Sequence, residues 1–115
     1  MEESVLALER LQVGRRVVVA AAGEIDLGSV SALSAAIEAA MSDGARELWI
    51  DLSEVTFLDS TGVHALLDTH LRVSDNGCRV AVICPEGPAR RTLAVCGVDG
   101  TLPVFASRDQ AHRSG

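Results

Sequence analysis

The chain of 115 residues has no lysine and no tyrosine, and all ten of its basic residues are arginines. Sixteen acidic residues outweigh them and give a formal net charge of −6. An acidic chain without a basic block binds phosphate backbones poorly. The aromatic residues are only Trp49, Phe57 and Phe105, too few for a platform on which bases stack. We therefore expect no nucleic-acid partner.

Long hydrophobic runs are also missing. The longest apolar run, from Val17 to Ala22, is far shorter than the roughly 20 residues that a membrane span needs. The acidic start Met1-Glu2-Glu3 differs from the basic start of a secretory signal peptide. We therefore expect a cytoplasmic protein with no membrane partner.

Cysteine is scarce, and its spacing excludes two common uses. The three cysteines, Cys78, Cys84 and Cys96, cannot form a closed disulfide framework. Their intervals of 5 and 11 intervening residues lack the close pairs of a zinc site. We expect buried, reduced thiols, and neither a metal nor another cofactor.

Hydrophobic periodicity predicts alternating strands and helices in a single domain over residues 1–115. Strands are predicted at Ser4–Leu11, Val17–Ala22, Glu47–Leu52, Arg79–Cys84 and, as a short edge strand, Leu102–Phe105. Helices are predicted over Val30–Met41 with Ser29 or Ser31 as cap, after Asp59–Gly62 as far as Asp75, over Ala89–Val95 and over Ser107–His112. The second helix has its predicted apolar face at Val63, Leu66, Leu67, His70 and Leu71.

This order of elements predicts an α/β fold. Strands that alternate with helices form right-handed parallel crossovers, and the short first connection adds an antiparallel hairpin. We expect a small mixed sheet of about four to five strands with helices mainly on one face. The leading strand leaves an exposed edge, so a monomer and a weak dimer both remain open.

Two predicted loops meet at one edge of this sheet. The segment Gly23–Gly28 follows the second strand, and Asp59-Ser60-Thr61-Gly62 precedes the second helix. Because the carboxyl ends of parallel strands share an edge, we expect Glu24, Asp26 and the Asp59–Thr61 segment to lie on one surface.

The Asp59–Gly62 segment allows three interpretations. Asp59 or Ser60 can cap the helix. Ser60 and His64 can face each other at helical spacing, but Asp59 stands beside the would-be nucleophile and cannot orient a base in the way a catalytic triad requires. Ser60 can also accept a phosphate, whose charge of about −1.5 to −2 would repel a partner docked on this acidic surface. We expect no enzymatic activity.

Two motifs extend the third interpretation. Gly23-Glu24-Ile25-Asp26 and Val55-Thr56-Phe57-Leu58-Asp59-Ser60-Thr61-Gly62-Val63 strongly resemble those of the STAS-domain anti-sigma-factor antagonists. The resemblance continues through Arg79–Cys84, Gly87–Leu93 and Gly97-Val98. It covers about residues 4–111, which we expect to form the ordered core of a single STAS domain.

The resemblance implies a regulatory function. The unphosphorylated protein would bind a serine-kinase anti-sigma factor of the GHKL ATPase type and release a sigma factor. Phosphorylation of Ser60, with Thr61 the less favoured acceptor, would switch binding off, and a serine phosphatase would restore it. ATP and Mg²⁺ would belong to the kinase. A scaffold or small-ligand-sensing role on the same fold is the alternative.

The same resemblance, together with position near the two loops, indicates the partner-binding residues. They are Glu24, Asp26, Leu27, Ser29, Asp59, Ser60, Thr61, Gly62 and His64. His64 stands where a small residue is common in the family and is a candidate for selecting the partner. Asp26 also fits a cap for the first helix, and the two roles are compatible.

Overall fold

The computed structural model describes residues 6–114, so the predicted strand start at Ser4 lies outside the described residues. Its strands are β1 (Leu6–Val13), β2 (Arg16–Ile25), β3 (Glu47–Leu58), β4 (Arg79–Ile83) and β5 (Val104–Phe105). Its helices are α1 (Val30–Ser42), α2 (Ser60–Ser74), α3 (Pro88–Val95), the 3₁₀ turn η1 (Val98–Gly100) and α4 (Arg108–Ser114). No helix within residues 6–114 combines the length and apolar character needed to cross a membrane.

The five strands form one mixed sheet in the order β1-β2-β3-β4-β5. β1 and β2 are antiparallel, and the register from Leu6↔Gly23 to Val13↔Arg16 is uninterrupted. Gly14, with φ of 62°, opens the two-residue turn between them, where a residue without a Cβ is favoured. The pairs β2–β3, β3–β4 and β4–β5 are all parallel. The predicted mixed α/β sheet is confirmed.

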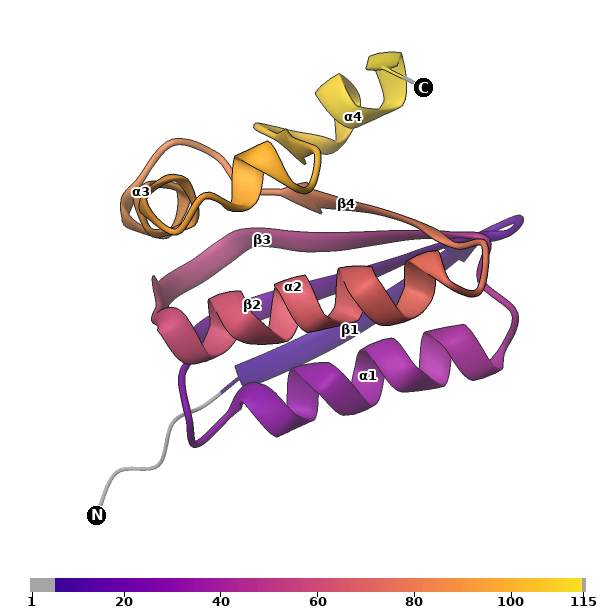
Figure 1. Cartoon of the computed structure of the whole chain (residues 1–115), viewed down its shortest axis with the longest axis horizontal. Coiled ribbons are helices and arrows are strands. Elements are labelled where there is room, and N and C mark those ends of the chain that lie inside the picture. The colour runs from indigo at the N-terminus through magenta and orange to yellow at the C-terminus, as the bar shows by residue number, and fades with distance from the viewer. Residues whose placement is uncertain (1–5, 115) are drawn as a thin grey trace.

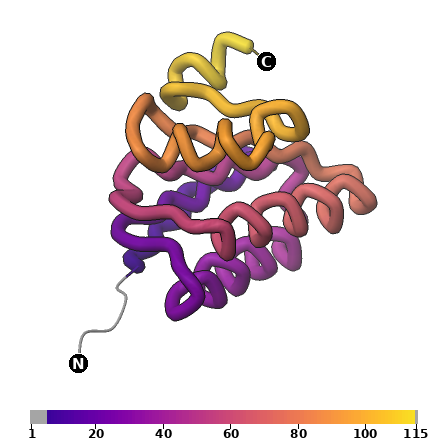
Figure 2. Tube along the Cα trace, turned by 60° about the vertical axis from the view of Figure 1, so that its left-hand side comes forward, coloured from indigo at the N-terminus to yellow at the C-terminus, as the bar shows by residue number. Residues whose placement is uncertain are grey.

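Helices α1, α2 and α3 cover one face of the sheet, and α4 packs on the other. The main core joins alternate residues of β2, β3 and β4 to Leu33 of α1, Leu66 of α2 and Leu93 of α3. A smaller cluster on the second face contains Trp49 of β3 and Ala111 of α4. α1 and α2 run side by side, and α4 lies on the far side of the sheet from them (Figures 1 and 2). Helices therefore lie mainly on one face, as predicted.

Two strands are longer than the sequence pattern predicted. β2 continues through Glu24 and Ile25, which were assigned to a loop, and β3 continues from Leu52 to Leu58. The β2–β3 register shifts between Ala20 and Ala22 and again between Gly23 and Glu24. Such bulges interrupt the alternation of polar and apolar residues, so the periodicity of one strand alone conceals them. The extension carries both strands to the edge where α1 and α2 begin.

The apolar face of α2 also differs from the prediction. Leu71 is 66% exposed, and His70 is only half-buried. The buried positions are Gly62, Val63, Leu66, Thr69 and Val73. Thr69 is buried without an unsatisfied hydroxyl because its Oγ1 donates to the carbonyl of Ala65 at 2.8 Å, a bond back along the helix.

The prediction of buried cysteines is confirmed for two of three positions. Cys78 and Cys84 are buried, and burial raises the pKa of both thiols. Cys96 is exposed, so its prediction was wrong. It follows the last residue of α3 as the C-cap, where the chain turns away through Gly97 with φ of 76°.

Candidate functional site

The ends of β2 and β3 bring the two predicted loops together. Ile25 and Leu58 are paired as the last residues of these parallel strands. The backbone N–H of Asp59 donates to the carbonyl of Ile25 at 3.3 Å, and Thr56 Oγ1 donates to the carbonyl of Gly23 at 3.2 Å. The shared edge expected for Glu24, Asp26 and the Asp59–Thr61 segment is therefore present.

Asp59 is the N-cap of α2. Its backbone is extended, with φ of −108° and ψ of −175°. Its Oδ1 accepts from the N–H of Thr61 at 2.9 Å and of Gly62 at 3.3 Å. These are donors that the first turn of a helix otherwise leaves unpaired. Of the two predicted caps, Asp59 and not Ser60 fills the role.

Ser60 is the first residue of α2 and is exposed. Its hydroxyl makes no hydrogen bond to any other residue in the described range 6–114. The neighbouring Thr61 is half-buried. The hydroxyl presented most openly at this edge is therefore that of Ser60.

Gly62 lets α2 approach the sheet closely. A Cβ at this position would lie 2.5 Å from Leu58 Cδ1 and 2.7 Å from Ile25 Cγ2. Both distances are shorter than a van der Waals contact, and both neighbours are buried. Gly62 is therefore required for the short distance between the start of α2 and the ends of β2 and β3. It is buried beneath the exposed residues of the site.

The loop between β2 and α1 is organised by Asp26 and Ser29. Asp26 Oδ1 accepts from the N–H of Gly28 at 2.9 Å and of Ser29 at 3.2 Å. Ser29 occupies the N-cap position, but its hydroxyl does not cap α1. It donates to the carbonyl of Glu24 at 2.6 Å and accepts from the N–H of Asp26 at 3.1 Å. Ser29 is only 5% exposed, so its side chain braces the loop and is not offered to a partner.

The exposed side chains at the ends of β2 and β3 and at the segments that follow them mix acidic, apolar and aromatic groups. Glu24 and His64 are exposed, and Leu27 is 80% exposed. Phe57 is 48% exposed and pairs with Glu24 across β2 and β3. The sequence pattern did not mark Phe57 as a surface residue. One feature of the sequence indicated this exposure. Successive side chains of a strand point to opposite sides, so Phe57 points away from the side on which its neighbour Leu58 is buried.

The serine-hydrolase interpretation finds no support in this geometry. Among residues 6–114, no hydrogen bond joins Ser60 to His64. Asp59 directs its carboxylate to the amides of α2 and so does not orient an imidazole. The described residues also contain no cluster of three or more His, Cys, Asp or Glu side chains suited to a metal ion.

The chain belongs to the STAS domain family, whose family model matches residues 7–111. It is 34% identical over 89 residues to the anti-sigma-F factor antagonist RsfB of Mycobacterium tuberculosis. The aligned region covers 77% of this chain and 72% of that protein.

Solved structures show the same fold. An anti-sigma factor antagonist from Mycobacterium paratuberculosis superposes with a TM-score of 0.88 at 30% identity, covering 96% of this chain and 93% of that one. The anti-sigma factor antagonist SpoIIAA in its unphosphorylated form superposes with a TM-score of 0.76 at 23% identity, covering 94% and 96%. At 23% identity, the similarity to SpoIIAA shows a common fold alone.

Proposed function

We propose that this chain is an anti-sigma factor antagonist switched by phosphorylation of Ser60. In the unphosphorylated form it binds an anti-sigma factor of the GHKL serine-kinase type and frees a sigma factor. The family membership and the names of its relatives in two mycobacteria support this role. The observation that carries the proposal is the exposed, unengaged Ser60 hydroxyl at the edge shared by β2, β3 and α2.

The partner kinase supplies the chemistry of the switch. It holds ATP and Mg²⁺ and places the γ-phosphoryl group in line with Ser60 Oγ. The new P–O bond forms on Oγ as the bond to ADP breaks, and the hydroxyl proton passes to a base of the kinase. This chain is the substrate and not an enzyme. A serine phosphatase later hydrolyses the phosphoserine, and both reactions take place in the cytoplasm.

The helix N-terminus explains why the added phosphate would remain at the surface. Free amides at a helix start normally attract anions. Here the N–H groups of Thr61 and Gly62 already donate to Asp59. A phosphate on Ser60 would therefore face solvent, beside the carboxylates of Asp59 and Glu24, and add a charge of about −1.5 to −2. A docked partner would be repelled without any unfolding of the domain.

The exposed residues define the surface that the partner contacts. Leu27 and Phe57 supply apolar contacts, Glu24 supplies negative charge, and His64 and the half-buried Thr61 flank Ser60. This surface fits a partner with an apolar pocket rimmed by basic side chains. Asp26, Asp59, Ser29 and Gly62 hold the contacting segments in place through the bonds and packing described above. His64 is the candidate for selecting between kinases.

Binding measurements test the switch. Wild type, Ser60→Ala and Ser60→Asp would be titrated into candidate GHKL kinases from the same genome. Ser60→Ala should bind like the unphosphorylated wild type, and Ser60→Asp should bind more weakly because one carboxylate adds part of the charge of a phosphate. Thr61→Ala is the matched control. If Ser60→Asp binds as tightly as Ser60→Ala, charge at this position does not control docking, and the scaffold alternative is favoured.

A further inference from the structure

A trough runs along the second face of the sheet, between α4 and the edge strand β1. It is open to solvent and has a volume of about 330 Å³, at the lower end of the range for small-ligand pockets. Its floor is formed by Val18 and Trp49, which are buried. Its outer wall is formed by Leu11 and Val13, which are 50% and 58% exposed. Exposed aliphatic side chains thus gather along one side of a hollow whose floor is also apolar.

Arg108 of α4 borders this trough with a fixed guanidinium group. Its Nε donates to Asp51 Oδ2 at 2.6 Å. The Asp51 side chain is only 7% exposed, and its Oδ1 accepts from Ser53 N at 2.9 Å and Ser53 Oγ at 2.5 Å. The Arg108 side chain is 45% exposed, and its two Nη groups have no partner among residues 6–114. A buried carboxylate therefore orients an arginine whose remaining donors are unengaged.

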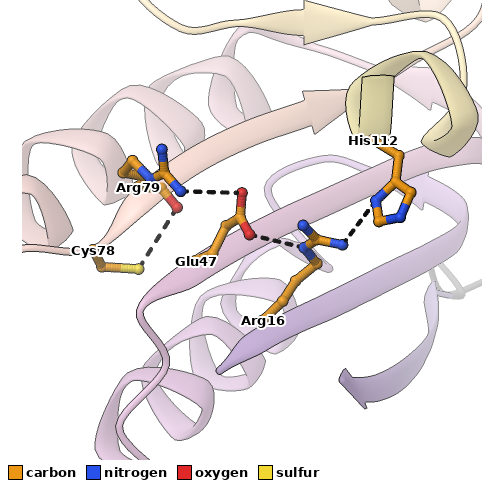
Figure 3. A network of polar contacts seen from close by, with 5 residues as sticks. All are labelled: Arg16, Glu47, Cys78, Arg79 and His112. Carbon is orange, nitrogen blue, oxygen red and sulfur yellow. Dashed lines mark hydrogen bonds and ion pairs between the residues drawn. The ribbon is translucent and has the colours of Figure 1, made fainter. Parts of the chain in front are cut away.

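The other charged groups that line this trough are already paired. Arg16 Nε contacts Glu47 Oε1 at 2.8 Å, and its Nη1 lies 3.2 Å from His112 Nδ1 (Figure 3). Its guanidinium also lies 4.0 Å above the Trp49 ring, a cation–π contact. Asp109 contacts Arg113 at 3.0 Å. Of the two arginines that line the trough, Arg108 is the one with both Nη groups unengaged, and it is therefore the better placed to receive an external anion.

We propose that the trough binds an apolar monocarboxylate about the size of octanoate. The two Nη groups of Arg108 donate to the carboxylate, a paired geometry that suits a planar anion. The alkyl chain lies over Val18, between Leu11, Val13 and the edge of Trp49. A smaller hollow of about 220 Å³ adjoins at Arg108 and is also lined by Glu9 and Arg10; covering these two charged side chains with an aliphatic tail would cost solvation, so we place the tail on the Trp49 side. The site is separate from Ser60 and does not depend on the proposed switch.

Calorimetry on the full chain tests the proposal, with Trp49, the sole tryptophan, as a fluorescence reporter in the trough. The probes are sodium octanoate, octan-1-ol and sodium acetate. Octanoate should bind about tenfold more tightly than either of the others, since only octanoate combines the apolar chain with a charge-assisted hydrogen bond. No detectable octanoate binding up to its solubility limit would overturn the proposal. So would equal affinity for octanoate and octanol.

Two variants separate the head-group contact from the apolar contact. Arg108→Gln should weaken octanoate binding about tenfold, whereas Arg113→Gln on the same helix should not change it. Leu11→Gln leaves the Arg108–Asp51 pair intact and should weaken octanoate and octanol alike. Unchanged octanoate affinity in a folded Arg108→Gln protein would overturn the proposal. Sedimentation that shows a dimer unable to bind octanoate would also overturn the proposal, because a second copy of the chain would then cover the trough.

Discussion

The backbone N–H of Asp59 donates to the carbonyl of Ile25 at 3.3 Å, across the ends of two parallel strands. This bond continues the pairing of Ile25 with Leu58 to the first residue outside β3. It fixes the start of α2, and with it Ser60, relative to the loop that follows β2. The proposed acceptor therefore stands on a rigid edge whose supporting residues can be tested individually.

Gly62→Ala should destabilise the domain. Its methyl group would lie 2.5 Å and 2.7 Å from side-chain atoms of Leu58 and Ile25. Overpacking of this kind costs about 1–3 kcal/mol and should outweigh the gain of about 1 kcal/mol that alanine brings within a helix. Urea denaturation measures the free energy of unfolding.

Gly100→Ala is the matched control for this variant. A Cβ at Gly100 meets no heavy atom within 4 Å, and its φ is not positive. Its free energy of unfolding should stay within about 0.5 kcal/mol of the wild type. Equal stability of the two variants would contradict the close approach of α2 to the strand ends.

Asp59→Ala should lower the free energy of unfolding by about 1 kcal/mol, because the amides of Thr61 and Gly62 lose their acceptor. Asp59→Asn keeps a side-chain oxygen and should stay close to the wild type. Thermal and urea denaturation of the three proteins would show the difference. A loss of equal size in both variants would mean that the negative charge, and not the capping bond, carries the effect.

Leu27→Ser should weaken partner binding without changing stability. Leu27 is 80% exposed in the loop between β2 and α1, and truncating an apolar contact within an interface costs about 1–2 kcal/mol, or roughly 5- to 30-fold in affinity. Leu71→Ser is the matched control, since Leu71 is 66% exposed toward the other end of α2. Titration of the kinase with both variants measures the effect. If Leu71→Ser weakens binding more, the partner docks elsewhere.

Asp51→Asn should change the pH dependence of stability. Burial raises the pKa of Asp51, but the hydrogen bonds from Ser53 and the bond and charge of Arg108 outweigh burial and leave this pKa below its ordinary value. The carboxylate therefore stabilises the fold at neutral pH, and this contribution is lost as the pH falls below about 4, through the lowered pKa of the folded state.

The variant should accordingly be less stable than the wild type at pH 7, and the gap should narrow in acid. Denaturation across this pH range measures it, with Asp99→Asn as control, an exposed carboxylate without an ion pair among residues 6–114. A gap that stays constant with pH would show that Asp51 contributes only through packing.

The sheet topology and the site edge were predictable because they depend on local patterns. Alternating strands and helices imply parallel crossovers, and parallel strands place Asp26 and Ser60 at one edge. The cap at the start of α2 was limited to two adjacent residues, of which Asp59 proved to be the one. These features follow from periodicity, topology and the chemistry of short polar side chains.

The features that escaped prediction depend on contacts between distant residues. The extension of β3 to Leu58 requires bulges against β2, which no single strand reveals. The burial of Ser29 depends on the carbonyl that Glu24 presents to it. Arg108 meets Asp51 across 57 residues of sequence, and neither lies in a motif. Only the folded arrangement shows such pairs.

Intact-mass measurement after incubation with ATP, Mg²⁺ and each candidate GHKL kinase tests the central claim most directly. Wild type, Ser60→Ala and Thr61→Ala would be compared in parallel. The account predicts one added phosphate on the wild type and on Thr61→Ala, and none on Ser60→Ala. Normal phosphorylation of Ser60→Ala, or complex formation without phosphorylation of any variant, would contradict it.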